Sequence, residues 1–441
     1  MENKNWIHKG LSRRDFMKKT TMAAGGGLFL GSLPIGASAH AGATSTLNVA
    51  VIGCGGRGTG AANQVLNVEG TKIVALHDAF RDRLDGCYNA LAQRHADSGR
   101  LDVPEERKFV GFDGYEEAIA LADVVILTAP PGFRPAHFES AVRQGKHIFA
   151  EKPMATDAPG VRSILESARI AKEKDLNVVI GLQRRYQRKY LEVVDRVHNG
   201  AMGDIISGQI YWNDGGVWVR ERQPDMSEIE YQMRNWYYFT WICGDHILEQ
   251  HIHNIDIANW FIGEYPESCN GMGGREVRNT KEHGHIFDHH YVEFTYPSGA
   301  VIASQCRHIP NTFSRVSERF QGTRGTVDCA PGLIRDYSGI VRYDHDGTDD
   351  PNPYQQEIDD LFAAIRNGNR IDDSDFGAKS TLAAIMGRMA TYSGQVITWD
   401  NAINSDAKLV PDYVGWDMEP PIKPDENGYY PIPVPGVTAP H

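Results

Sequence analysis

A glycine pattern near residue 50 is the first group whose spacing indicates chemistry. Gly53, Gly55 and Gly58 form a GxGxxG pattern that directly follows the apolar run Leu47–Ile52 and precedes a helical stretch, residues 59–67. Between a strand and a helix, such glycines allow a tight turn, close approach of the backbone to a pyrophosphate, and close helix packing. The free N–H groups at the start of the helix favour phosphate. The pattern therefore predicts a dinucleotide site.

An acidic residue supports this interpretation. Asp78 ends the next apolar run, twenty positions after Gly58, where a carboxylate can accept hydrogen bonds from the adenosine ribose. It favours NAD, because a 2′-phosphate would meet a like charge. Arg81 and Arg83 lie close enough to leave NADP open.

Residues 244–256 contain a second group of reactive side chains. On a continuous α-helix each residue turns by about 100°. One face would then carry Asp245, His246, Glu249, His253 and Asp256. His251 would point the other way. A buried helix face is normally apolar, so a polar face indicates a site, with a hydrogen-bonded core histidine as the alternative for His253.

The elements that must position these residues alternate between strand and helix through residues 45–175. Alternation of this length predicts a doubly wound parallel sheet, which binds ligands at the carboxyl ends of its strands. Gly53, Asp78, Thr128 and the run Glu151-Lys152-Pro153 all lie at such ends. These positions extend the dinucleotide site to the neighbouring Gly56, Arg57 and Pro130.

Residues 176–441 differ in character. Residues 208–212 begin a strand, and residues 291–306 read as a hairpin around Pro297-Ser298-Gly299. Helices are expected over 354–367 and 378–392, and the Pro-rich residues 420–440 are expected to form an extended surface arm. The predicted fold class is α/β, with a second α+β domain built on a large, mainly antiparallel sheet.

Several motifs resemble the Gfo/Idh/MocA oxidoreductase family. They are GxGxxG at 53–58, Gly145 to Pro153 with its Glu-Lys-Pro, Gly181 to Tyr186, Gly322 to Val327, and Glu357 to Gly368. The Glu-Lys-Pro motif is the most specific of them. The resemblance covers about 350 residues of the mature chain. It implies a Rossmann domain over 45–175, a substrate-binding and oligomerisation domain over 176–441, and a homo-oligomer.

The resemblance also implies roles for single residues. Lys152 would contact the nicotinamide ribose and the substrate hydroxyl, and Glu151 would hold the ribose. His253 matches the family's catalytic base, which takes the hydroxyl proton as hydride leaves. Glu249 stands where the family carries an aspartate and would orient His253, and His251 stands where a glycine is common.

The expected substrate is a small carbohydrate. Aromatic residues gather between 211 and 241, and aromatic faces stack on sugars, although core packing would account for most of them. The candidate substrate contacts are Arg185, Trp212, Trp236, Asp245 and His246.

A metal site is the alternative for the histidines. His246, Glu249 and His253, together with the run from His283 to His290, offer many ligands. No spacing here matches HExxH, and the sequence does not bring the two segments together. The prediction is therefore a site without metal, with NAD as its cofactor.

The first 41 residues read as an export signal. Ser12-Arg13-Arg14-Asp15-Phe16-Met17-Lys18 is a twin-arginine pattern, followed by an apolar stretch, residues 22–36, and small-residue cleavage sites. The stretch is short and glycine-rich for a membrane anchor. We expect export through the twin-arginine machinery to the periplasm, with no stable membrane anchor.

Composition excludes other classes. The chain has 441 residues, 41% hydrophobic, with a net charge of −12 and six cysteines without a CxxC pair. Such a surface disfavours nucleic acid, and the cysteines do not form a disulfide scaffold.

Three hypotheses remain for the function. One is an oxidoreductase acting on a carbohydrate hydroxyl, with tightly bound NAD that a second substrate restores. The second is a glycosidase or epimerase that oxidises transiently and re-reduces. A sugar-binding protein with a vestigial cofactor site is disfavoured by the presence of both Lys152 and His253.

Overall fold

The first of two sheets is fully parallel. The computed structural model describes residues 46–96 and 98–440, so the predicted export signal lies outside the described residues. Its strand order is β3-β2-β1-β4-β5-β6. The strands are β1 Leu47–Ile52, β2 Thr71–Asp78, β3 Lys108–Val110, β4 Val124–Leu127, β5 His147–Ala150 and β6 Val178–Ile180. The predicted doubly wound sheet is confirmed, and it continues past residue 175 because β6 pairs with β5.

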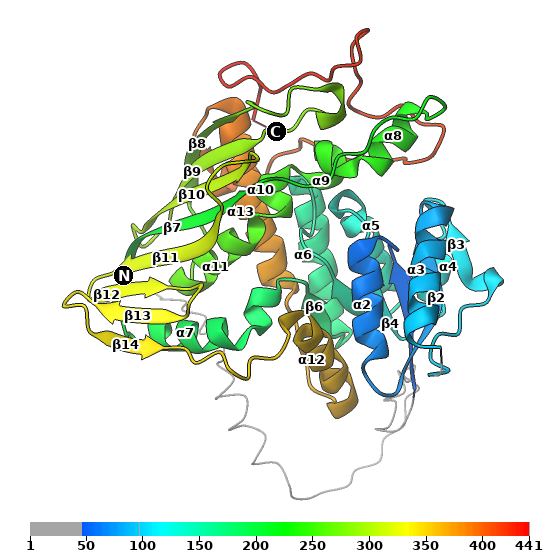
Figure 1. Ribbon diagram of the computed structural model, residues 1–441, viewed down its shortest axis with the longest axis horizontal. Coiled ribbons are helices and arrows are strands. Elements are labelled where there is room, and N and C mark those ends of the chain that lie inside the picture. Colours follow the sequence, from blue (N-terminus) through cyan, green and yellow to red (C-terminus); the bar gives the residue numbers. More distant parts are fainter. Residues whose placement is uncertain (1–45, 97, 441) are drawn as a thin grey trace, which may run out of the picture. The chain divides into compact units, whose positions relative to one another are not determined.

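Helices cover both faces of this sheet (Figure 1). They are α2 Gly56–Leu66, α3 Arg81–Arg94, α4 Tyr115–Ala120, α5 Arg134–Arg143 and α6 Ala158–Glu173. Apolar residues of α2 and α3 pack on one face, and those of α4, α5 and α6 pack on the other. Helix α12, Pro353–Asn367, adds Ile358, Leu361 and Phe362 to the α2 and α3 side. A helix from the far end of the sequence thus completes the first core.

The second sheet has nine strands in the order β14-β13-β12-β11-β7-β10-β9-β8-β15. They are β7 Ile205–Asp214, β8 Ser268–Gly274, β9 His289–Thr295, β10 Val301–His308, β11 Arg315–Gly322, β12 Gly325–Asp328, β13 Leu333–Asp336, β14 Val341–Asp344 and β15 Ile397–Thr398. All neighbours are antiparallel except β7 and β10. The predicted mainly antiparallel sheet is confirmed, and β9 and β10 form the predicted hairpin.

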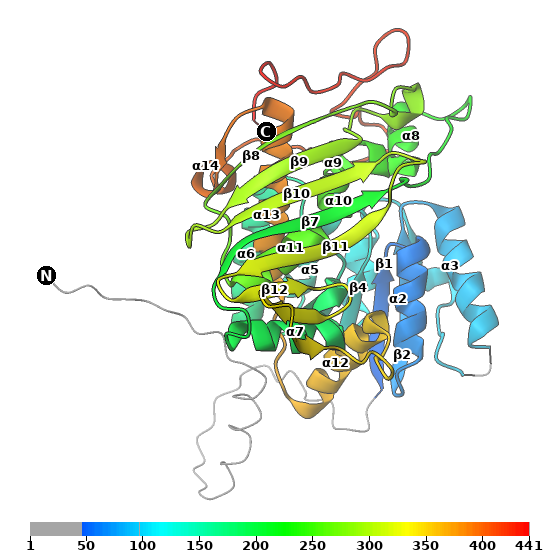
Figure 2. The ribbon, with the colours of Figure 1, turned by 60° about the vertical axis from the view of Figure 1, so that its left-hand side comes forward.

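The remaining helices connect and cover the two sheets. They are α7 Arg188–His198, α8 Glu228–Arg234, α9 Thr240–Cys243, α10 His246–Glu249, α11 Ile252–Ile262, α13 Ser374–Ser393 and α14 Trp399–Ile403. Helix α13 packs against β8 and β9 of the large sheet and also against α6 and β6. Figure 2 shows the large sheet with α10, α11 and α13 behind it. No helix among residues 46–96 and 98–440 is long and apolar enough to cross a membrane.

The continuous helix considered for residues 244–256 does not form. Gly244 and Asp245 both have positive φ, 84° and 81°, and they separate α9 from α10. A second break follows before α11 begins at Ile252. Asp245 is held in its unusual conformation by buried bonds from the Phe287 N–H and the Tyr392 hydroxyl. Tertiary hydrogen bonds therefore override the helical pattern and send the polar side chains to different places.

Candidate active site

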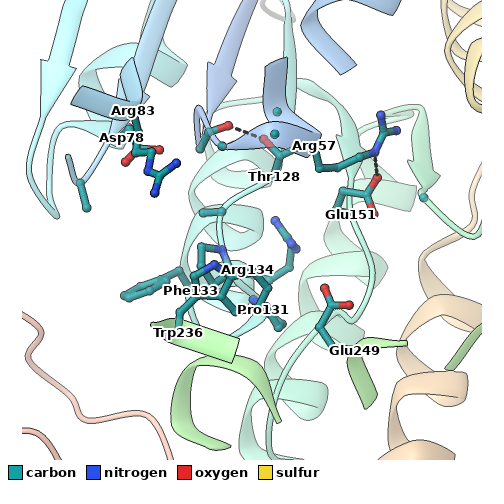
Figure 3. Close-up of a pocket in the computed structure, with 18 of the residues that line it drawn as sticks. Arg57, Asp78, Arg83, Thr128, Pro131, Phe133, Arg134, Glu151, Trp236 and Glu249 are labelled. Carbon is teal, nitrogen blue, oxygen red and sulfur yellow. Dashed lines mark hydrogen bonds and ion pairs between the residues drawn. The ribbon is translucent and has the colours of Figure 1, made fainter. Parts of the chain in front are cut away.

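A cavity of about 660 Å³ opens at the carboxyl ends of the parallel strands. Figure 3 shows Asp78 and Arg83 on one side, and Glu249 on the other, with the turn before α2 between them. The lining residues come from the parallel sheet, from the segment 212–236 and from α10 and α11. The cavity thus joins the predicted dinucleotide turn to the predicted catalytic residues.

The glycine turn has the shape that a pyrophosphate requires. Gly53 has φ of +99°, and a Cβ on Gly58 would lie 1.9 Å from the carbonyl oxygen of Gly53. In contrast, a Cβ on Gly55 or Gly56 would have no protein atom within 4 Å, so both open onto free space. Thr128 Oγ1 donates to the Gly53 carbonyl over 2.7 Å and closes the turn. The free space at the start of α2 fits a dinucleotide phosphate.

Replacing Gly58 with alanine is expected to weaken cofactor binding strongly. The new methyl group would overlap the backbone of Gly53, and backbone cannot move away as a flexible side chain can. We expect the dissociation constant for NAD, measured by calorimetry, to rise at least about 100-fold, which corresponds to about 2.7 kcal/mol. Gly60→Ala in the same helix is the control, since its nearest contact is a flexible arginine end at 3.6 Å. Equal affinity of the two variants would contradict this account of the turn.

Asp78 lies at the end of β2 beside the turn. Its two carboxylate oxygens accept the N–H groups of Phe80, over 2.9 Å, and Cys54, over 2.7 Å. Burial raises the pKa of Asp78, and these two bonds and nearby Arg83 oppose the rise. Both backbone bonds fix the carboxylate at the cavity wall, where a ribose hydroxyl would reach it.

Arg57 belongs to a charged group under the turn. Its guanidinium pairs with Glu151 (Figure 3). It also pairs with Glu357 of α12 over 2.9 Å. Burial raises the pKa of Glu357 well above its ordinary range. Arg57 and Glu151, both predicted cofactor ligands, line the cavity, and in the protein alone they bind each other. Glu357 lies three hundred positions from Arg57 and begins one of the family-like motifs, but the sequence did not place it beside the turn.

Lys152 and Glu249 form an ion pair at the other end of the cavity. The Lys152 ammonium lies 2.8 Å from Glu249 Oε2 and also donates to the Glu249 carbonyl oxygen. Burial raises the pKa of Glu249, and the ammonium opposes that rise. The peptide bond between Lys152 and Pro153 is cis. Glu249 therefore positions Lys152, and no hydrogen bond joins it to His253 among the described residues.

His253 lines the same end of the cavity. Its ring stacks on that of Trp212 with centroids 5.8 Å apart, and its Nδ1 has no hydrogen-bond partner among the described residues. Burial lowers its pKa well below the ordinary histidine value, and the Lys152 charge acts in the same direction. The imidazole is therefore neutral near pH 7 and able to accept a proton.

Three of the predicted substrate contacts lie outside the cavity wall. Trp212 and Trp236 line it, but Asp245, His246 and Arg185 do not. Asp245 and His246 are fully buried and lie beside His290. Arg185 makes two bonds of 2.8 Å to Asp256, so a carboxylate within the protein already occupies its guanidinium.

Replacing Asp256 with alanine is expected to destabilise the fold. Arg185 would be left unpaired among Trp260 and Phe376, and removal of one partner from a buried pair costs about 3–5 kcal/mol. Chemical denaturation should reveal the loss as a lower midpoint. Asp406→Ala, which removes an exposed partner of Arg162, should change the midpoint little. A similar cost for both variants would contradict a structural role for the buried pair.

The histidines predicted as possible metal ligands do not form one site. Asp245, His246 and His290 bring ligand atoms within 4.8 Å of one another. The Arg278 guanidinium lies 3.5 Å from His246 Nδ1 and donates to His308 Nδ1 over 2.8 Å. A fixed positive charge this close to one of the three candidate ligand residues disfavours a dication. The geometry thus favours a hydrogen-bonded core over a metal centre.

Sequence reasoning missed several lining residues. Arg134 at the start of α5 is 1% exposed, donates to the Leu127 carbonyl over 2.7 Å, and its Nε has no partner among the described residues. Burial lowers its pKa to about 10. Further unpredicted lining residues include Phe80, Phe112, Phe133, Arg220, Arg234 and Gln250. Only the position of Arg134 after Pro130-Pro131, at a strand end, carried a usable signal.

A dinucleotide cradle that opens on a lysine and a neutral histidine defines the class of nicotinamide-dependent oxidoreductases. Family comparison agrees with the class. Residues 47–182 match the oxidoreductase family with an NAD-binding Rossmann fold, Gfo/Idh/MocA, and residues 190–328 match the C-terminal domain of the same family. The chain belongs to the Gfo/Idh/MocA family, and its cofactor is NAD.

The curated relatives share between about a quarter and a third of their residues with this chain over the matched segments. An inositol 2-dehydrogenase of Cereibacter sphaeroides is 32% identical over 236 residues, which are 53% of this chain and 60% of that protein. One from Rhizobium meliloti is 24% identical over 351 residues, 77% of this chain and 94% of the relative. The fold is shared with the aldose-aldose oxidoreductase of Caulobacter crescentus, with a TM-score of 0.61 and 19% identity over 80% of this chain and 99% of that one.

Proposed function

We propose that the protein oxidises a secondary hydroxyl of a small carbohydrate or cyclic polyol. The observation that carries the proposal is the placement of Lys152 and neutral His253 together at one end of a cavity whose other parts fit a dinucleotide. The similarity to inositol 2-dehydrogenases supports a polyhydroxylated ring as substrate. Trp212, stacked on His253, offers an aromatic face beside the base.

In the proposed reaction, one residue accepts the hydroxyl proton and another stabilises the negative charge on the substrate oxygen. NAD, when bound, supplies the hydride acceptor. His253 takes the hydroxyl proton as the C–H bond breaks, and burial keeps its imidazole neutral for this task. The Lys152 ammonium donates to the same oxygen and stabilises the negative charge that develops there. Glu249 holds that ammonium in place through the pair of 2.8 Å.

We also propose export and a cofactor that stays bound through turnover. The twin-arginine pattern at residues 12–18 supports export, and a periplasmic enzyme has no large pool of free NAD. A second carbonyl substrate would then reoxidise the bound NADH. The same proposal includes a homo-oligomer, supported by the family resemblance. Cell fractionation and sedimentation of the processed chain test the location and the assembly, and a cytoplasmic or monomeric protein would contradict them.

The central experiment follows the absorbance of reduced nicotinamide in the purified protein without added NAD. Adding myo-inositol or an aldose should reduce the bound cofactor stoichiometrically, and adding a second aldose should reverse the signal. Release of an aglycone from an aryl glycoside with no lasting change in absorbance would instead identify a redox-neutral glycosidase. If none of these compounds changes the absorbance or releases an aglycone, the proposed oxidation of these substrates is contradicted.

A further inference from the structure

The C-terminal tail is tied to the rest of the molecule by hydrogen bonds at several separate points. Residues 405–440 form no helix or strand, and they lie outside the segments that match the family. Leu409 and Val410 donate to Asp157, the Ile422 carbonyl accepts from Gln232 over 2.6 Å, Tyr430 donates to Glu228 over 2.6 Å, and Gly436 donates to the Ser393 carbonyl over 2.7 Å. Residues 420–440 lie largely on the surface, as expected, but hydrogen bonds fix the tail at several points. We call residues 405–440 the strap, and Figure 1 shows it running past α8.

The strap reaches the adenosine end of the cavity at Trp416. The Trp416 ring lies 5.1 Å from that of Phe80 and 4.6 Å from that of Phe112, centroid to centroid. Both phenylalanines line the cavity, Phe80 two residues after Asp78 and Phe112 just after the neighbouring strand β3. Trp416 itself is not among the lining residues and is 41% exposed. It therefore supports two wall residues from behind.

Helix α8 closes the same end and is braced by the same tail. The Arg234 guanidinium lies 4.1 Å from the Phe80 ring centroid and pairs with Asp82 over 3.2 Å. Gln232 of α8 is the side chain that bonds to Ile422 of the tail. Phe80 is thus enclosed by Arg234 of α8 and Trp416 of the tail.

We propose that the tail backs the wall of the adenosine subsite, with Trp416 as the positioning residue that sets Phe80 and Phe112 against the bound cofactor. The inference deepens the proposed function, because a strap of this kind retains NAD between two half-reactions. Without the indole, the two rings gain a solvent-exposed back and more rotameric freedom, so the wall holds the adenosine less firmly.

The test is Trp416→Ala in the full chain. Holoenzyme loaded with NADH is mixed with excess ADP-ribose, and the loss of the fluorescence of bound NADH gives the release rate. We expect release about tenfold faster, as for the loss of one to two aromatic pairs. Tyr413→Ala is the matched control: this aromatic residue of the same tail is 61% exposed, bonds to Asp417, and should leave the rate unchanged.

A second readout separates positioning from general loosening. The affinity for ADP-ribose should fall about tenfold in Trp416→Ala, while that for nicotinamide mononucleotide stays within about twofold because its site lies at Lys152. Equal weakening of both affinities, or of neither, would overturn the proposal.

If Trp416→Ala does not fold, Phe112→Leu keeps an apolar side chain without the ring and should lower the affinity for ADP-ribose but not that for nicotinamide mononucleotide. Loss of NAD from the wild type on desalting would contradict cofactor recycling, and the ADP-ribose comparison would still decide the role of the tail.

Discussion

Replacing Lys152 with methionine is expected to lower kcat by about 10³-fold, within the range for groups that transfer or stabilise a proton. The thioether keeps most of the volume of the side chain but donates no hydrogen bond to the substrate oxygen. It also leaves Glu249 without its ammonium, so burial should raise the pKa of that carboxyl further. A protonated, misplaced Glu249 would add to the loss.

The measurement is single-turnover reduction of bound NAD by the best sugar. Lys146→Met is the control, because this lysine precedes the same strand β5 and bonds to the Ala122 carbonyl outside the cavity. Lys152→Arg keeps the charge and should fall between the two. If Lys152→Met reduces its cofactor at the wild-type rate, the lysine has no part in the chemistry.

Replacing His253 with glutamine is expected to lower kcat by a similar factor, about 10²–10⁴-fold. Glutamine can hydrogen-bond the hydroxyl but cannot take its proton. The unfolding midpoint should change much less than the rate, because Nδ1 of His253 has no partner in the described structure to lose. His251→Gln is the control two residues away, where the ring bonds to Ser304 instead of facing the cavity.

The pH profile adds a second measurement on His253. A base works in its neutral form, so the rate should fall as the pH drops below its pKa. Because burial lowers that pKa well below the ordinary value, the wild-type rate should hold through pH 6.5 and decline only at lower pH. A decline beginning above neutrality would assign the proton transfer to another group.

The parts of the site that sequence predicts well are local in the chain. The Gly53 turn, its following helix and Asp78 lie within thirty residues, and their spacing reflects one strand-turn-helix unit. Lys152 follows the same logic, because every strand end of a parallel sheet meets the same edge. The alternation of strands and helices therefore predicts both the first sheet and the edge where its ligand binds.

The parts of the site that the sequence did not predict depend on residues that are far apart in the chain. The helical pattern over 244–256 does not contain the buried bonds that Asp245 receives from Phe287 and Tyr392. Arg185 was predicted to contact the substrate, but its guanidinium pairs with Asp256, seventy-one positions later, which the sequence does not place beside it. Trp416 carried no signal, since only the folded tail brings it to Phe80 and Phe112.

The position of helix α12 in the sequence affects how the protein can fold during its synthesis. The helix supplies Ile358, Leu361 and Phe362 to the core of the first sheet, and its Glu357 pairs with Arg57 at the phosphate turn. Domains often fold in order as a nascent chain leaves the ribosome. Here the N-terminal half must wait, because its missing helix is synthesised three hundred residues later. The apolar face that α12 covers would therefore stay exposed to chaperones during most of translation. A chain that ends before α12 could not form the Arg57–Glu357 pair at the phosphate turn.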